Sequence, residues 1–227
     1  MNDLPPHLHP TRILITAGST QEPIDEVRFL GNRSSGKLGA LLAISAADAG
    51  YEVTLLHGPR TISPTSHPRL QAFPFSSSRD LKAKLDEFWQ SHSILIMAAA
   101  VSDYTPKGGQ VDGKLKRGES MTLDLVPTQD IVASISEHSR EDQRIIAFAL
   151  EEQEELRDAA HAKLIRKGVD AIIANPLETM ESSKINATIL LKDGSELNPP
   201  THCTKAEFAR WLIENLNLVT RITSQAK

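Results

Sequence analysis

The chain has 227 residues, of which 40% are hydrophobic and 24% charged, and a formal net charge of −4 at pH 7. These values describe a soluble globular protein with one large α/β domain or two small ones. The net negative charge gives no electrostatic basis for nucleic-acid binding, and no apolar run is long enough to span a membrane. The first ten residues, MNDLPPHLHP, lack the order of a signal peptide, so we expect a cytoplasmic location.

Cysteine and histidine residues do not form a recognisable metal or redox motif. Cys203 is the single cysteine, which excludes an internal disulfide and a cysteine cluster for zinc. The eight histidines show no HxH or HxxxH spacing except at His7 and His9 near the N-terminus. We therefore expect no metal site built from these residues.

The first predicted elements are a strand and a helix separated by a long polar loop. Residues 12–17 (RILITA) form an apolar run typical of a buried strand that ends at Gly18. From Lys37 onward one helical face carries the apolar residues Leu38, Leu41, Leu42, Ala46 and Ala49. We expect Ser34 or Ser35 to cap this helix, and Gly36 and Gly39 to let its first turn approach a ligand closely.

This strand–loop–helix unit is a candidate phosphate site. A helix N-terminus offers free N–H groups and a partial positive charge, and Lys37 adds a full charge. The alternative is a purely structural segment, an ordinary strand-to-helix loop with a serine cap. However, Lys37 follows Gly18 by about 19 positions, whereas such loops commonly have about 2 to 6 residues. The length favours a functional loop.

The rest of the chain predicts an alternation of strands and helices. Strands are expected over residues 52–57, 70–75, 93–100, 144–150 and 170–175, with turn-rich residues 58–68 as loop. One helix opens at residues 76–78 and carries Leu81, Leu85, Phe88 and Trp89 on its apolar face; others are expected over residues 131–138 and 154–167. This order predicts a Rossmann-like, doubly wound, mostly parallel α/β sheet with right-handed crossovers.

Two segments depart from the alternation. Residues 101–127 contain SDYTPKGG, KLKRGES and the alternating MTLDLV, which predict an excursion with a small antiparallel strand or arm that covers a site or a partner. Near the end, residues 187–197 predict a hairpin around Asp193-Gly194, and Thr204 with Glu207 predicts a capping box before a last helix. We expect a single domain over residues 1–227 with its core at about 10–220.

Two common nucleotide motifs are absent. The dinucleotide fingerprint needs G-x-G-x-x-G and an acid after the second strand, but Ser19 and Thr20 follow Gly18 and the second strand ends at His57. The P-loop pattern also fails, because NRSSGKLG lacks the first glycine and the hydroxyl residue after the lysine. An NAD-dependent reductase is therefore disfavoured, and a nucleotide would bind by another arrangement.

Other candidate residues lie at a strand end, in the arm and on a helix. Small residues at the end of the fourth strand leave room for a base or sugar, or simply pack tightly: Ala98, Ala99 and Ala100, with Asp103 beyond them. The arm residues Lys114, Lys116 and Arg117 form either a solvated face or a site that neutralises a triphosphate. Lys163 and Lys167 share one helix face.

Four segments, in order, resemble the phosphopantothenoylcysteine synthetase family (phosphopantothenate–cysteine ligase). They are ITAGSTQEPIDEVRFLGNRSSGKLG, AAAVSDYTPK followed by KLKRG, VPTQDIVASI and KLIRKGVDAIIAN, and the likeness covers about residues 10 to 220. Ordered motifs of this length are far more specific than a single glycine pattern.

The resemblance implies a coenzyme A biosynthetic ligase that acts as a homodimer with Mg²⁺. In this family the carboxylate of 4′-phosphopantothenate attacks a nucleoside triphosphate to give an acyl-nucleotide and pyrophosphate, and the amine of L-cysteine then displaces the nucleotide. Bacterial members use CTP, so we expect CTP, with ATP as the alternative. Many members carry a fused flavin decarboxylase domain; we expect a monofunctional form here, with a separate decarboxylase as a candidate partner.

The resemblance also implies roles for individual residues. Asn32 matches the asparagine that handles the acyl-nucleotide, and Lys114 matches the first lysine of the K-x-K element; we expect both to be catalytic. The expected nucleotide-binding residues are Gly18, Ser34, Ser35, Gly36, Lys37, Ala98, Ala99, Ala100, Asp103, Gln129, Asp130, Ile131, Val132, Phe148, Lys163 and Lys167. The likeness does not identify the Mg²⁺ ligands.

Several positions depart from the family pattern. Arg33 stands where histidine is common, Gln129 where proline is common, and Pro176 where aspartate is common. AFALEEQ (residues 147–153) replaces GFAAET, and the later F-x-x-D-x-N pattern is reduced to Ser182 to Asn186. The alternative reading is a non-catalytic nucleotide-binding or assembly protein that has kept the fold.

Overall fold

A computed structural model describes residues 11–61, 66–118, 120–152, 154, 156–177 and 182–220. Several sequence-based predictions fall partly outside these ranges: the N-terminal segment with its histidine pair, the middle of the 58–68 loop, residue 119 of the arm, Gln153 of the altered segment and residue 155 of the predicted helix. Within the described part, no helix is long and apolar enough to cross a membrane.

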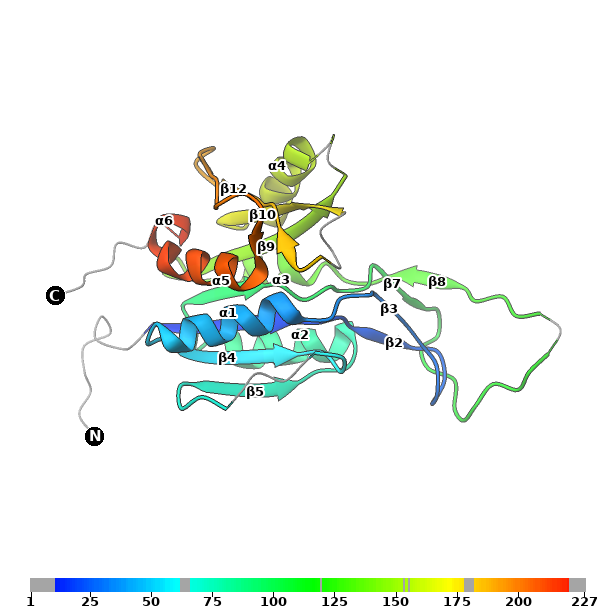
Figure 1. Cartoon of the computed structure of the whole chain (residues 1–227). Helices are drawn as coiled ribbons and strands as arrows, with labels where there is room; N and C mark the ends of the chain where they lie inside the picture. Colours follow the sequence, from blue (N-terminus) through cyan, green and yellow to red (C-terminus); the bar gives the residue numbers. More distant parts are fainter. Residues whose placement is uncertain are drawn as a thin grey trace.

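The centre of the fold is an eight-stranded sheet (Figure 1). Its strands lie in the order β5 (Leu70–Pro74), β4 (Glu52–His57), β1 (Arg12–Ala17), β6 (Ile94–Met97), β9 (Arg144–Glu151), β10 (Ala171–Pro176), β12 (Thr188–Leu191) and β13 (Glu196–Leu197). The first six are parallel, whereas β12 and β13 are antiparallel and extend the sheet beyond β10. The predicted doubly wound, mostly parallel sheet is therefore confirmed, and the predicted hairpin forms its edge.

Helices cover both faces of the sheet. One layer is α1 (Lys37–Asp48), α5 (Lys205–Glu214) and α6 (Leu216–Thr220), and the other is α2 (Ser78–Trp89), α3 (Ile131–Glu137) and α4 (Leu156–Lys167). In β1, Ile13 and Ile15 pack on the α1 side and Leu14 on the α2 side, all fully buried. Burial of such a side chain contributes about 1.5–3 kcal/mol, so two-sided burial accounts for the unbroken apolar run.

Three of the five predicted helices begin with a side-chain cap. Ser77 caps α2, Asp130 caps α3, and Thr204 forms the complete capping box of α5 with Glu207. The prediction for α1 was wrong. Its N-cap is Gly36 in the left-handed region (φ 70°), with no side-chain cap.

The buried face of α1 also differs from the prediction. Ala49 follows the helix and is exposed, and the buried residues that face the sheet are small except for Leu42: Gly39, Leu42, Ala43, Ala46 and Ala47. A Cβ on Gly39 would lie 2.5 Å from the Cβ of Ala17, so only glycine allows this approach of α1 to β1.

Two hairpins extend from the carboxyl end of the sheet as an arm (Figure 1). The predicted arm contains the antiparallel pair β7 (Tyr104–Pro106) and β8 (Leu125–Pro127). The long loop after β1 contains a second, unpredicted pair, β2 (Gln21–Pro23) and β3 (Phe29–Gly31). A further short pair, β11 (Lys184–Ile185) and β14 (Cys203–Thr204), precedes α5.

Asp25 joins the two hairpins. Its Oδ1 accepts hydrogen bonds from the backbone N–H groups of Val27 and Arg28 at 2.8 and 2.7 Å. Its Oδ2 accepts from Arg28 Nη1 at 2.6 Å and from the Leu115 N–H at 3.1 Å. Burial alone would raise the pKa of Asp25, but these backbone bonds and the Arg28 charge outweigh it and hold the pKa below its usual value. The carboxylate thus fixes the segment that carries Lys114.

Replacement of Asp25 should loosen the arm. In Asp25→Asn the amide accepts fewer hydrogen bonds and loses the charge that pairs with Arg28. We expect tryptic cleavage after Lys114 to become several-fold faster, because cleavage follows the population of the open segment. Asp142→Asn, at an exposed carboxylate paired with Arg140, is the matched control. Equal cleavage rates in wild type and Asp25→Asn would contradict this role.

His92 makes stability depend on pH. It is 4% exposed; its Nδ1 donates to the Phe88 carbonyl at 2.7 Å and its Nε2 accepts from Thr54 Oγ1 at 2.9 Å. Burial lowers the pKa of His92 below its ordinary 6.5, and the Arg12 charge lowers it further. The folded state therefore favours the neutral ring, whereas the unfolded state takes up the proton first as the pH falls.

The free energy of unfolding should consequently decrease as the pH falls below about 6.5, until the lower pKa of the folded state is passed. Urea denaturation between pH 5 and pH 7.5 measures this change. His92→Gln should show a smaller slope than wild type, and His138→Gln, at an exposed ring, should keep the wild-type slope. An unchanged slope in His92→Gln would show that other groups cause it.

Candidate functional site

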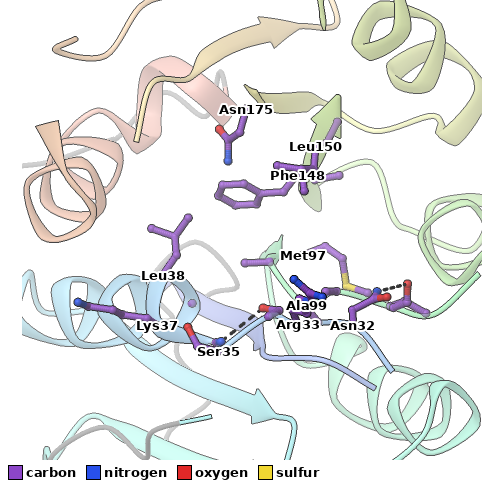
Figure 2. Close-up of a pocket in the computed structure, with 18 of the residues that line it drawn as sticks. Asn32, Arg33, Ser35, Lys37, Leu38, Met97, Ala99, Phe148, Leu150 and Asn175 are labelled. Carbon is purple, nitrogen blue, oxygen red and sulfur yellow. Dashed lines mark hydrogen bonds between the residues drawn. The ribbon is translucent and has the colours of Figure 1, made fainter. Parts of the chain in front are cut away.

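A cavity of about 640 Å³ opens at the carboxyl ends of β6, β9 and β10, beside the N-terminus of α1 (Figure 2). The strand order reverses between β1 and β6, and open α/β sheets bind ligands at such a reversal. Most residues expected to handle a nucleotide line this cavity: Asn32, Ser34, Ser35, Gly36, Lys37, Ala98, Ala99, Ala100, Asp103, Val132, Phe148, Lys163 and Lys167.

Four of the expected nucleotide-binding residues support the cavity without lining it. Gly18 (φ 83°) accepts a hydrogen bond from the Ala100 N–H at 2.8 Å. Gln129 donates to Ser134 Oγ, Asp130 caps α3, and Ile131 is buried in the core.

Lys114 lies apart from Asn32. It lines a second cavity on the arm together with Arg28, Leu115, Lys116, Arg117, Gly118, Ser120 and Met121. Within one chain the structure therefore does not bring the two residues expected to be catalytic into one cavity.

Threonine side chains shape the floor of the cavity. Thr16 Oγ1 accepts from the Ala99 N–H at 3.0 Å, and Thr20 Oγ1 accepts from the Ser102 N–H at 3.0 Å. These bonds turn the chain out of β6 after Met97, which is why the strand is shorter than the predicted 93–100. The turned segment meets the loop before α1 where Asn32 Nδ2 donates to the Val101 carbonyl at 3.2 Å (Figure 2).

The first turn of α1 faces this floor as an anion site. The Ala40 N–H makes the first intrahelical bond, to Gly36 O at 3.0 Å. The N–H groups at the preceding positions therefore have no helical acceptor and, with the helix dipole, favour a phosphate or carboxylate. Lys37 lies at the same end of the cavity (Figure 2).

The two lysines of α4 are neutralised within the protein. Lys163 pairs with Glu151, and Lys167 pairs with Asp130 at 2.8 Å. Burial alone would raise the pKa of Asp130, but the Lys167 contact and the Ala133 N–H hold it below its usual value. The α3–α4 end of the cavity therefore carries much less net positive charge than the two lysines alone would suggest.

Three polar residues of the lining were not predicted as site residues: Arg33, Asn175 and Lys205. Lys205, the first residue of α5, reaches the cavity; burial lowers its pKa, and the charge of Lys37 lowers it further. Asn175 is the last residue but one of β10 and is 9% exposed. A polar residue near the end of an apolar strand was a usable signal for Asn175, whereas Lys205 resembles any surface lysine in the sequence.

The cavity does not contain a ready-made metal site. Among the described residues, no group of three or more His, Cys, Asp and Glu side chains is placed to hold a metal ion. Asp103 is the one carboxylate in the described lining. Mg²⁺ is commonly bound through one or two carboxylates together with substrate phosphates and waters, so this arrangement fits a metal that arrives with a nucleotide.

Comparison with known proteins gives a consistent family. The family described as the DNA/pantothenate metabolism flavoprotein C-terminal domain matches residues 8–219. A cysteine/cysteine sulfinic acid decarboxylase from an unknown prokaryotic organism is 41% identical over 172 residues, which cover 75% of this chain and 47% of that protein. The coenzyme A biosynthesis bifunctional protein CoaBC of Vibrio cholerae is 34% identical over 197 residues, 84% of this chain and 48% of that protein. The chain thus spans about half the length of these relatives.

Solved structures share the fold. The C-terminal domain of a CoaBC protein superposes with a TM-score of 0.77 at 32% identity, covering 95% of this chain and 98% of that one. The DNA/pantothenate metabolism flavoprotein of Streptococcus pneumoniae gives a TM-score of 0.79 at 28% identity, covering 92% and 99%. A Cab2 variant in complex with phosphopantothenate-cysteine has the same fold, with a TM-score of 0.77 at 19% identity over 95% of this chain and 89% of that one.

With a match over residues 8–219 and this shared fold, the chain belongs to the family of the DNA/pantothenate metabolism flavoprotein C-terminal domain.

Proposed function

We propose that this chain is a ligase that joins 4′-phosphopantothenate to L-cysteine through an acyl-nucleotide, with CTP as the nucleotide. The observation that carries this proposal is the meeting of Asn32 and Val101 beside the N-terminus of α1. It places an amide and a helix N-terminus in one cavity, as the activation of a carboxylate by a nucleotide requires. The complex of phosphopantothenate-cysteine with a protein of this fold supports the choice of substrates.

The reaction has two balanced steps. In the first, a carboxylate oxygen of 4′-phosphopantothenate attacks the α-phosphorus of CTP, and pyrophosphate leaves with the electrons of the broken P–O bond. In the second, the amine of cysteine attacks the acyl carbon, loses a proton, and displaces CMP. No covalent bond to the protein is needed.

The residues of the chain contribute position and charge. The first turn of α1 and Lys37 stabilise phosphate charge, which grows on the leaving pyrophosphate. Asn32 can donate through Nδ2 and accept through Oδ1, so it orients the acyl group. Asp103 would hold a Mg²⁺-bound water, and the metal, when bound, would neutralise charge on the triphosphate.

We also propose that the chain works as a homodimer formed through the arm. Exposed apolar residues gather on the two hairpins and their connections: Val27, Phe29, Tyr104, Val111, Met121, Leu123 and Leu125. Such a concentration of exposed apolar side chains is typical of an interface. The basic cavity that contains Lys114 lies on the same arm, so a second copy would receive these cations.

One observation favours a second candidate, a non-catalytic nucleotide-binding protein. Lys163 and Lys167 are neutralised by Glu151 and Asp130, and Lys114 lies outside the Asn32 cavity. A protein with this arrangement could bind a nucleotide without promoting attack at phosphorus. Such a binder would show nucleotide-dependent melting shifts but would not release pyrophosphate.

Pyrophosphate release tests the two candidates. The purified protein with 4′-phosphopantothenate, cysteine and Mg²⁺ should release pyrophosphate faster with CTP than with ATP, and only when phosphopantothenate is present. Asn32→Asp should lower kcat by about 10²–10³, the cost of losing one donor to a developing charge, while the melting temperature stays near that of wild type. Asn198→Asp, at an exposed asparagine outside the cavity lining, is the matched control. Full activity of Asn32→Asp would remove Asn32 from the mechanism.

The dimer is tested by mass in solution. Light scattering after size exclusion should give twice the chain mass for wild type, and Leu125→Glu combined with Met121→Glu should give a monomer, because buried carboxylates would be desolvated at the interface. Leu218→Glu changes an equally exposed leucine on α6, far from the arm (Figure 1), and should leave the dimer intact. A monomeric wild type would rule out the dimer.

A further inference from the structure

Glu22 is a buried carboxylate that the proposed mechanism does not use. It lies in the middle of β2 and is 3% exposed. Its Oε1 accepts a hydrogen bond from the backbone N–H of Ser78 at 2.9 Å, and its Oε2 accepts from Ser78 Oγ at 3.1 Å. A buried carboxylate is tolerated only where donors satisfy it, and here each oxygen has one.

This contact ties the hairpin of β2 and β3 to α2. Ser78 is the first residue of α2, where free N–H groups and the helix dipole favour a negative charge. β2 lies beside this end of α2 (Figure 1), and the Gln21 N–H adds a bond to the Ser76 carbonyl at 2.8 Å. Glu22 therefore joins the hairpin to a helix that begins 56 residues further along the chain.

The hairpin needs such an anchor because its two strands are only three residues long. An isolated two-stranded hairpin is marginally stable in water. At its base, the Thr20 N–H donates to the Ala100 carbonyl at 3.2 Å, and Thr20 Oγ1 accepts from the Ser102 N–H at 3.0 Å. At its tip, Asp25 contacts the arm. Glu22 lies between base and tip and connects the hairpin to the helix layer.

Asn32 directly follows the anchored hairpin. Gly31, the last residue of β3, pairs with Gln21, the neighbour of Glu22. The Asn32 side chain is exposed, and its bond to the Val101 carbonyl is 3.2 Å long. Such a bond competes with water and holds a side chain weakly. The place of Asn32 in the cavity therefore depends on the backbone of β3.

We propose that Glu22 is a positioning residue for the ligase reaction: by binding the start of α2 it holds the β2–β3 hairpin so that Asn32 stays in the cavity beside Val101. The inference rests on the proposed function, to which the role of Asn32 belongs. Glu22 does not line the cavity, so it acts through the backbone of the hairpin and not on a substrate.

Hydrogen exchange of the ligand-free protein tests the anchor without turnover. In Glu22→Ala the hairpin loses its tie to α2, so the amide groups of residues 29–33 should exchange several-fold faster than in wild type, because exchange follows the population of the open segment. Exchange at the wild-type rate in these residues would overturn the proposal.

Gln143→Ala is the matched control. Gln143 is 4% exposed, and its Nε2 donates to the carbonyls of Trp89 and His92, both at 2.8 Å, at the other end of α2. Both alanine variants remove two buried hydrogen bonds at α2, so both should melt at a lower temperature than wild type. Only Glu22→Ala should change the exchange of residues 29–33.

Turnover gives the second readout. Glu22→Ala should lower kcat for pyrophosphate release by about 10²-fold, the cost of displacing a reacting group by about 1 Å. The dissociation constant of CTP should stay the same, because the N-terminus of α1 does not belong to the hairpin. Gln143→Ala should keep the wild-type kcat.

Two further variants separate positioning from chemistry. In Glu22→Gln the amide can accept from the Ser78 N–H and donate to Ser78 Oγ, so kcat should be close to that of wild type. A kcat as low as in Glu22→Ala would assign the carboxylate itself to the chemistry and contradict the positioning role. In an Asn32→Ala background, Glu22→Ala should cost no further kcat, because Glu22 acts through Asn32. A full additional loss would refute that path.

Ser78→Ala is the milder change should Glu22→Ala fail to fold. It removes the hydroxyl donor and keeps the backbone N–H, so exchange at residues 29–33 should rise and kcat should fall, each by about tenfold or less. Wild-type values of both quantities in Ser78→Ala would overturn the proposal.

The outcomes separate this inference from the proposed ligase activity. Faster exchange at residues 29–33 in Glu22→Ala, with no pyrophosphate release from wild type, would refute the ligase and keep Glu22 as the anchor of the Asn32 segment. Pyrophosphate release from wild type, with an unchanged kcat in Glu22→Ala, would refute the positioning role and keep the ligase.

Discussion

The close approach of α1 to β1 is the constraint on which the site depends. Gly39 lies against Ala17, and Gly36 takes a left-handed conformation at the start of the helix. Thr61 fills the space beside Gly36, where an added Cβ would lie 2.4 Å from its Oγ1, and this hydroxyl donates to the Ala17 carbonyl at 3.3 Å. Any larger residue at Gly36 or Gly39 would push the helix away from the strand, and the free N–H groups of its first turn would no longer face the cavity.

The sequence predicted the elements whose cause is local and missed features whose cause lies in tertiary contacts. Apolar period and capping residues identified the six parallel strands, the arm and the start of α5 correctly, because burial and caps act within a few residues. The predicted cap of α1 was wrong because Gly36 takes the N-cap position in the left-handed region, packed against Thr61, which lies far along the chain. Most predicted site residues meet in one cavity, but Asn175 and Lys205 join it through the packing of β10 and α5, which no local pattern records.

Charge divides the cavity into two unlike ends. At the α4 end, Lys163 and Lys167 each have a carboxylate partner, so an anion bound there would compete with Glu151 or Asp130. At the α1 end, Lys37 lies close enough to Lys205 for its charge to add to the effect of burial and lower the pKa of Lys205. Repulsion between two ammonium groups is relieved by an anion between them. An anion in the cavity would therefore meet the N–H groups of the helix N-terminus at the α1 end and existing ion pairs at the α4 end.

The arm places a limit on how Lys114 can act. Of the four hydrogen bonds that Asp25 accepts, the one from the Leu115 N–H holds the segment of Lys114, and the Val111 N–H adds a backbone bond to Ile24 O at 3.0 Å. Folding Lys114 back onto Asn32 of its own chain would break the bond from Leu115 to Asp25 and the bond from Val111 to Ile24. If Lys114 instead reached the cavity of a second copy, both bonds would remain, and the contact would cover the exposed apolar residues of the arm. The same contacts that separate Lys114 from its own cavity therefore favour a site completed by two chains.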